Sequence, residues 1–216
     1  MKFLFQGDSI TDGNRCKDKN MEWDKNHQIG HSYAYLLTAY LSLKYFERNY
    51  VFINRGVSGN TTEDLLLRWQ VDCIDITPDV LILLIGTNDI CYQKSDVYDT
   101  DMLQYKQNYR ELLLQIKVCN PNVRIVLLEP FGFVSLQPKD VSGGEVERAT
   151  ALKNVQKIVS ELSAEFNAMF VPLQTAFDEM ALLSEAKYWI WDGIHPTEAG
   201  HALIAKEVLR KLELLF

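Results

Sequence analysis

The chain has 216 residues, of which 47% are hydrophobic and 24% charged, and its formal net charge is -7 at pH 7. These values predict a soluble globular protein that forms a single domain over residues 1–216. The acidic balance, with no basic face evident, argues against nucleic acid as a partner. No apolar run approaches the roughly 18 residues that indicate a transmembrane helix, so no membrane partner is expected.

The N-terminus and the cysteines point to a reducing compartment. The first apolar stretch, Phe3–Phe5, is far shorter than the core of a signal peptide. The four cysteines are widely spaced and form no CxxC pair, so neither a disulfide framework nor a zinc site is predicted. They are Cys16, Cys73, Cys91 and Cys119. We therefore expect a cytoplasmic protein.

Strand-like and helix-like segments alternate along the chain. The run Val80–Ile85 is apolar without interruption, as expected for a parallel strand that is covered on both faces. Helices between successive strands imply right-handed crossovers and a parallel sheet. The predicted strands are Lys2–Gln6, Tyr50–Asn54, Val80–Ile85, Arg124–Glu129 and Met169–Val171. The predicted helices are Tyr33–Phe46, Thr62–Ile74, Asp101–Cys119, Glu145–Asn167 and Thr197–Leu214.

Two polar stretches, Asn14–His31 and Ser135–Gly144, are expected to be loops near one rim of the sheet. The first contains Trp23, which, with Tyr92 and Trp189, offers a flat apolar ring that suits a sugar. Ordinary packing is the favoured interpretation for each of these rings. His27, His31 and His201 are expected at the surface or at an interface rather than in a site.

The first strand is followed by Gly7-Asp8-Ser9, which reads as a sharp turn that presents a hydroxyl. Open α/β sheets place their chemistry at the carboxyl ends of their strands, and Ser9 lies at such an end. Serine is also common in ordinary turns, so the tripeptide alone leaves both interpretations open.

Two further turns follow the second and third strands. Around Gly59, glycine lets the backbone approach a ligand and point an N–H group at an anion, although Thr61 as an ordinary helix N-cap is the alternative. After the third strand, Asn88 offers a neutral side-chain donor that suits an oxyanion formed only in a transition state. The alternative there is that Asp89 merely caps the next segment.

Near the C-terminus, Asp192 precedes His195 by three residues, just ahead of the last predicted helix. In one turn its carboxylate can accept from His195 Nδ1–H and leave Nε2 free as a base. Pro196 is expected in the first helical turn. The alternative is a capping aspartate beside an ordinary turn histidine. The joint placement of all these residues at one sheet edge favours acyl transfer.

Four blocks of the chain together resemble the SGNH, or GDSL-type, hydrolase family. In the family's order they are GDSITDG with Ser9, NRGVSGNTT with Gly59, IGTNDI with Asn88, and WDGIHP with Asp192 and His195. Within the family, the chain most resembles acetylxylan esterases, on GHSYAYLL, NRGVSGNTTEDLLLRW, Ala176–Asp178 and WDGIHPTEAGHALIAKEVLR. The resemblance implies a three-layer α/β/α fold with a central five-stranded parallel sheet of flavodoxin-like order.

The resemblance also implies roles for individual residues. Ser9 would be the nucleophile, His195 the general base and then acid, and Asp192 the residue that orients His195. The oxyanion hole would consist of the Ser9 and Gly59 N–H groups and the Asn88 side chain. Asp8 would hold the serine turn, and Trp191 would line the acyl pocket. No metal or organic cofactor is required.

The expected activity is a serine esterase that removes O-acetyl groups from acetylxylan or acetylated xylo-oligosaccharides through an acyl-serine intermediate. One alternative is a broad short-chain esterase, thioesterase or lysophospholipase, and another is a non-catalytic sugar-binding protein on the same fold. No GxGxxG follows the first strand and no GK[ST] loop occurs, which argues against a nucleotide-binding enzyme. A small acetylated sugar is thus the expected partner, and a homo-oligomer is the expected assembly.

Overall fold

Five parallel strands form the centre of the computed structural model, which describes residues 1–18, 20, 24–93 and 98–213. The strands are β1 (Lys2–Gly7), β2 (Val51–Asn54), β3 (Val80–Leu84), β4 (Arg124–Leu128) and β5 (Met169–Val171). Their order in the sheet is β2-β1-β3-β4-β5. This is the flavodoxin-like order, in which the strand sequence reverses between β1 and β3.

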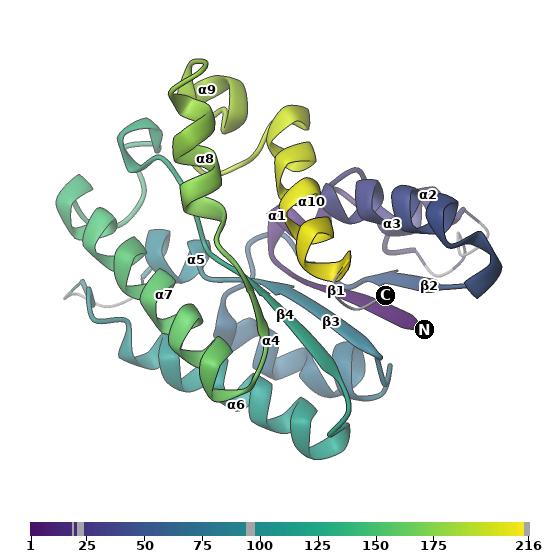
Figure 1. Cartoon of the computed structure of the whole chain (residues 1–216). Helices are drawn as coiled ribbons and strands as arrows, with labels where there is room; N and C mark the ends of the chain where they lie inside the picture. Colours follow the sequence, from purple (N-terminus) through teal and green to yellow (C-terminus); the bar gives the residue numbers. More distant parts are fainter. Residues whose placement is uncertain (19, 21–23, 94–97, 214–216) are drawn as a thin grey trace.

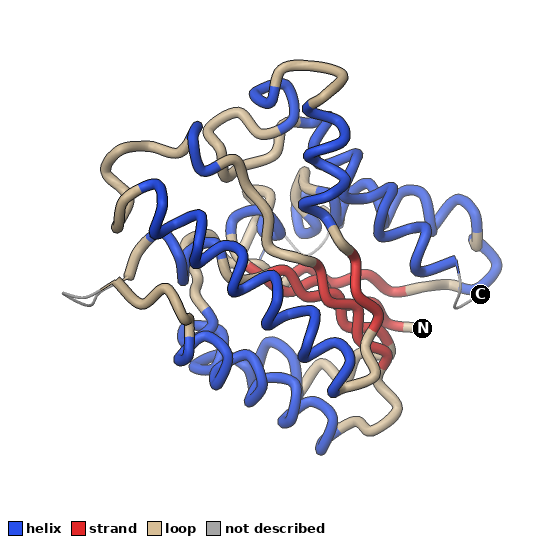
Figure 2. The backbone as a smooth tube through the Cα atoms, turned by 60° about the vertical axis from the view of Figure 1, so that its left-hand side comes forward, coloured by secondary structure: helices blue, strands red, loops and turns tan. Residues whose placement is uncertain are grey.

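Side-chain alternation along each strand divides the core into two layers. Phe3 and Phe5 of β1 face one layer and Leu4 faces the other, because successive strand residues point to opposite faces. Helices cover both faces, so the fold is a three-layer α/β/α sandwich (Figures 1 and 2). The first layer packs against α2 (Lys25–Ile29), α3 (Tyr33–Lys44), α8 (Leu173–Ala181) and α10 (Glu198–Leu212). The second packs against α4 (Thr62–Trp69), α6 (Leu103–Cys119) and α7 (Glu145–Glu165).

The predicted strands and long helices are confirmed, with shifts at their ends. Predicted Thr62–Ile74 is α4 followed by a π-helical segment, Gln70–Ile74. Tyr33–Phe46 ends as a helix at Lys44, and a 3-10 turn over Phe46–Arg48 follows. Leu214, the predicted end of the last helix, lies outside the described residues, as does Trp23.

Several short helices were not predicted. The stretch Asn14–His31 is not entirely a loop, because it contains α2, which begins after the N-cap Asp24. One-turn helices follow β1 and β3, namely α1 (Ser9–Asp12) and α5 (Thr87–Cys91). After β5 come α8 and α9 (Ala186–Trp189). Leu173, Phe177 and Met180 lie at helical spacing in α8, and this pattern could have revealed it.

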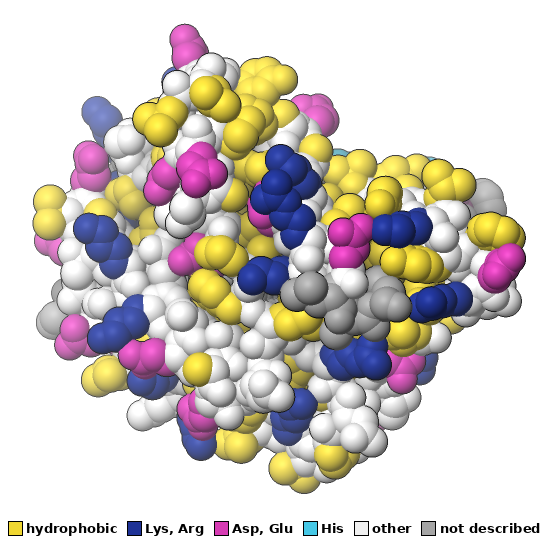
Figure 3. Space-filling model, in the orientation of Figure 1, with side chains coloured by type: hydrophobic (Ala, Val, Ile, Leu, Met, Phe, Trp, Pro, Cys, Tyr) yellow, Lys and Arg dark blue, Asp and Glu magenta, His cyan; other side chains and the backbone are white. Residues whose placement is uncertain are grey.

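Surface chemistry is mixed on the face seen in Figure 3, where acidic and basic side chains are interspersed. No field of a single sign therefore covers that face. Among the described helices, none is both long and apolar enough to cross a membrane.

Candidate active site

The first strand ends in a turn that only glycine can make. Gly7 has φ of 154°, and a Cβ there would collide with the Leu84 carbonyl oxygen of β3. Asp8 then caps α1, since its Oδ1 accepts from Ile10 N–H at 3.0 Å. Ser9 is therefore the first residue of a helix, where backbone N–H groups have no intrahelical partner. The turn thus presents both a hydroxyl and an N–H without an intrahelical partner at the carboxyl edge of the sheet.

Ser9 and His195 lie near opposite ends of the sequence but are neighbours in the structure. Ser9 Oγ lies 2.9 Å from His195 Nε2, and His195 Nδ1 lies 2.7 Å from Asp192 Oδ2. The hydrogen bond to Asp192 raises the pKa of His195, and burial opposes this only in part. Burial tends to raise the pKa of Asp192, but the hydrogen bonds from His195 and Ile194 bring it below its usual value. A serine hydroxyl beside an imidazole that a carboxylate orients is the arrangement that activates a nucleophile.

The segment that carries His195 is a tight loop rather than the start of a helix. Ile190 and Pro196 form an antiparallel bridge, and Trp191 N–H donates to the His195 carbonyl at 3.1 Å. Pro196 precedes α10, whose N-cap is Thr197, so its predicted place in the first helical turn is wrong. The Trp191 ring stacks on the His195 ring with centroids 5.9 Å apart, and it is 59% exposed. A largely exposed aromatic ring therefore lies beside His195.

Asp8 is a buried carboxyl group next to the serine. It is 1% exposed, and burial raises its pKa to about 7. Its Oδ2 has no hydrogen-bond partner within the described part of the chain. A carboxylate without a full set of donors is unfavourable away from water, which explains the direction of the shift.

The loop after β2 forms a tight turn at Gly59. Asn60 N–H donates to the Val57 carbonyl at 3.1 Å, and Gly59 has φ of 82°, as the third position of a type II turn requires. A Cβ at Gly59 would meet nothing within 4 Å, so the glycine is needed for its conformation and not for space. Ser58 N–H donates to Asp12 Oδ2 at 3.0 Å, which joins this turn to α1 and hence to Ser9. Thr61 is the N-cap of α4, as the alternative interpretation of this segment expected.

Asn88 reaches the same turn from the other side. It is 7% exposed, and its Nδ2 donates to the Asn60 carbonyl at 2.9 Å. An amide nitrogen carries two hydrogens, so one N–H of Asn88 is still available to a ligand. The next residue, Asp89, accepts from Thr62 N–H at 3.1 Å and from Thr62 Oγ1 at 2.6 Å. Asp89 therefore binds the start of α4 and does not cap its own segment.

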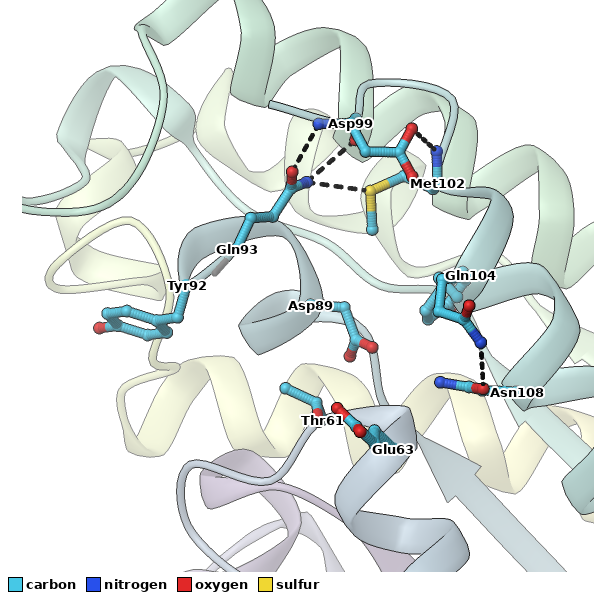
Figure 4. A pocket seen from close by; sticks show the side chains of 10 residues that line it. Thr61, Glu63, Asp89, Tyr92, Gln93, Asp99, Met102, Gln104 and Asn108 are labelled. Carbon is cyan, nitrogen blue, oxygen red and sulfur yellow. Dashed lines mark hydrogen bonds between the residues drawn. The ribbon is translucent and has the colours of Figure 1, made fainter. Parts of the chain in front are cut away.

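A cavity of about 280 Å³ borders these turns, and its lining does not include Ser9, Asp192 or His195 (Figure 4). Thr61 and Asp89 contribute to its wall. Thr61 follows Asn60 in the sequence, and Asp89 follows Asn88. Asp89 is buried, and this raises its pKa to about 6. Gln93 bonds to Asp99 and Met102 at one end, and Gln104 bonds to Asn108 at the other. Polar residues thus continue from the turns that carry Gly59 and Asn88 toward α6.

The remaining predicted residues have simpler surroundings. His27 and His31 are exposed, as expected. His201 is not at the helix surface: it is half-buried, its Nδ1 accepts from Tyr33 N–H at 3.2 Å, and burial lowers its pKa to about 4. Tyr92 is 55% exposed and lines the cavity, whereas Trp189 is half-buried against the first core layer. No group of three metal-ligating side chains occurs in residues 1–18, 20, 24–93 and 98–213.

Comparisons with known proteins show which family and which solved structures the chain resembles. Residues 5–203 match the model of the GDSL-like lipase/acylhydrolase family. An acetylxylan esterase of Geobacillus stearothermophilus is 31% identical over 98% of this chain and 93% of its own length. The solved structure of that organism's acetylxylan esterase Axe2 has a TM-score of 0.79 at 30% identity, covering 98% of this chain and 93% of the other. A GDSL-like protein from Parabacteroides merdae also has a TM-score of 0.79, at 34% identity, covering 97% of this chain and 94% of the other.

Proposed function

The chain belongs to the GDSL-like lipase/acylhydrolase family and is an esterase, and we propose that it removes O-acetyl groups from carbohydrates through an acyl-serine intermediate. The observation that carries the proposed mechanism is the 2.9 Å approach of Ser9 Oγ to His195 Nε2. Similarity to an acetylxylan esterase over 98% of the chain supports the substrate class, acetylated xylo-oligosaccharides or related sugars.

In the first half of the reaction, Ser9 Oγ attacks the ester carbonyl while His195 Nε2 takes its proton. Asp192 stabilises the resulting imidazolium and keeps the Nδ1 proton in place. The Ser9 N–H, the Gly59 N–H and the free N–H of Asn88 donate to the oxyanion of the tetrahedral intermediate. His195 then protonates the departing sugar hydroxyl, and the acetyl group stays on Ser9.

In the second half, a water molecule attacks the acetyl-serine carbonyl and gives its proton to His195. The same three donors bind the second oxyanion. Collapse of this intermediate releases acetate, and the proton returns from His195 to Ser9 Oγ. The exposed face of Trp191, beside His195, is placed to contact the sugar that carries the acetyl group.

Acetate release from a panel of acetylated xylo-oligosaccharides, acetylated glucosides and peptidoglycan fragments tests the substrate class. We expect release from the acetylated sugars and none with Ser9→Ala. A parallel series of 4-nitrophenyl esters tests the acyl group, and acetyl is expected to be preferred. Good activity on octanoyl esters would instead indicate a broad esterase or lysophospholipase. Absence of hydrolysis of any acetyl ester would contradict the proposal.

A further inference from the structure

We infer that Arg68 is a positioning residue that holds the Gly59–Asn60 turn and the end of β1 in the geometry needed by the oxyanion hole. This inference rests on the proposed esterase mechanism, because it concerns the donors assigned there. Arg68 lies on α4 and contacts none of Ser9, Asp192 and His195 through a hydrogen bond among the described residues.

The Arg68 guanidinium connects two pieces of backbone at the edge of the sheet. Its Nη1 donates to the Arg55 carbonyl, just after β2, at 2.8 Å. Its Nη2 lies 3.4 Å from the Gly7 carbonyl, directly before Asp8 and Ser9. Gly7 also accepts from Val57 N–H at 3.0 Å, so β1 and the turn-bearing loop are joined at one carbonyl. One side chain therefore ties the strand that precedes Ser9 to the loop that contains Gly59.

Asn60 transmits this restraint to the oxyanion donors. Arg68 Nε donates to Asn60 Oδ1 at 2.7 Å, and the Asn60 carbonyl accepts from Asn88 Nδ2 at 2.9 Å. The side chain of Asn60 is thus hydrogen-bonded to Arg68, and its main-chain carbonyl is hydrogen-bonded to Asn88. It also follows Gly59 directly, so its position helps to set the direction of the Gly59 peptide. A shift of Asn60 would move two of the three proposed donors together.

The positive charge of arginine and its planar set of N–H donors suit the position of residue 68. The Arg68 side chain is 18% exposed, and Asp72 pairs with it at 3.0 Å. Burial lowers the pKa of Arg68, yet a guanidinium stays protonated in proteins and keeps all its donors. Lysine would supply a positive charge, but it lacks the planar fork that reaches several acceptors at fixed angles. A charge-conserving replacement therefore separates geometry from electrostatics.

Misplaced oxyanion donors should slow the chemical step more than they weaken substrate binding. Donors aimed at an oxyanion act on the transition state, so their loss lowers kcat with little change in KM. A displacement caused by a remote substitution can cost about 10²-fold in rate. Simple destabilisation of the fold would instead reduce the active fraction, without coupling two particular residues.

The test is a double-mutant cycle of Arg68→Lys and Asn60→Ala, with kcat and KM measured on 4-nitrophenyl acetate. Asn60→Ala removes the contact with Arg68 Nε but keeps the carbonyl that binds Asn88. We expect Arg68→Lys to lower kcat by about 10²-fold and Asn60→Ala to lower it by a smaller factor, because the carbonyl that binds Asn88 remains, with little change of KM in either variant. Because the residues act in series, the double variant should be little slower than Arg68→Lys alone.

Arg110→Lys is the matched control, because Arg110 of α6 makes an exposed ion pair with Glu165 of α7 at 2.7 Å and, among the described residues, has no hydrogen bond to a proposed donor. We expect its kcat to equal that of the wild type. Unchanged kcat in Asn60→Ala would overturn the inference, and so would full additivity of the two effects on kcat in the cycle. If Arg68→Lys does not fold, the kcat of Asn60→Ala by itself tests the inference. A wild-type protein without esterase activity would overturn the proposed function instead, which is a distinguishable outcome.

Discussion

Asp192 holds both the ring and the main chain of His195. Its Oδ2 lies 2.7 Å from His195 Nδ1, and its Oδ1 accepts from His195 N–H at 2.7 Å and from Ile194 N–H at 2.9 Å. One carboxylate therefore fixes the loop and the imidazole together. The two oxygens have separable tasks, which a substitution can distinguish.

Asp192→Asn should keep the loop and lose the activity. The amide oxygen can still accept from the two backbone N–H groups, but the amide NH₂ would face Nδ1 and favour the tautomer with the proton on Nε2. Loss of the triad carboxylate in this way lowers kcat by about 10⁴-fold. Steady-state kinetics with circular dichroism check this, and a variant with near-normal kcat would exclude Asp192 as the orienting group.

The pH profile of kcat/KM should have an acid limb with its midpoint above 6.5, the ordinary pKa of histidine. The reason is that Asp192 raises the pKa of His195, and the base works only in its neutral form. Activity is therefore lost as pH falls through the raised pKa. A midpoint well below 6.5, measured with the acetyl ester over pH 4–9, would contradict this assignment.

Asn88→Ala should lower kcat by about 10²–10³-fold with little change in KM, which is the usual cost of one oxyanion donor. Asn120→Ala is a matched control, because Asn120 Nδ2 donates to the Pro78 carbonyl, before β3 and at the other end of that strand. Its kcat should be unaffected. Equal kcat in the two variants would remove Asn88 from the oxyanion hole.

Asp8→Asn should stabilise the fold at alkaline pH. Burial raises the pKa of Asp8 from 3.8 to about 7, so folding favours its protonated form. Stability from this group is present at low pH and lost as pH rises through about 7. The variant carries no such charge, so its melting temperature should exceed that of the wild type increasingly as pH rises from 3.8 to about 7, and the difference should stay constant at higher pH. An equal difference at every pH would contradict the raised pKa.

The same substitution should also move the acid limb. The Asp8 charge raises the pKa of His195, after the larger contribution of Asp192. Removing that charge therefore shifts the midpoint of kcat/KM to lower pH. The shift is measured by comparing the pH profiles of kcat/KM for Asp8→Asn and the wild type with the acetyl ester. An unchanged midpoint would contradict it.

The sequence was sufficient to predict an element or a contact where the hydrophobic pattern and the local chemistry agree. Uninterrupted apolar runs such as Val80–Ile85 predict buried parallel strands, and the Asp192–His195 spacing predicts a contact that the structure contains. Elements of one turn, such as α1 and α5, are too short to produce a helical period. Their existence depends on the strand ends that they follow.

Contacts made by long side chains could not be predicted. Arg68 and Asn60 are eight residues apart, with one on a helix and the other in a turn, and no spacing rule joins them. His201 looked like a surface residue because nothing in its helix indicates that Tyr33 N–H needs an acceptor. Cytoplasmic location and homo-oligomeric assembly stay predictions from the sequence.

Covalent labelling of Ser9 is the most direct measurement of the central claim. A fluorophosphonate reacts with an activated serine, so intact-protein mass spectrometry of the wild type should show one adduct, and peptide mapping should locate it at Ser9. The account predicts that Ser9→Ala takes up no probe and that Asn120→Ala is labelled like the wild type. Stoichiometric labelling of folded Ser9→Ala at another residue would contradict the assignment of Ser9 as the nucleophile.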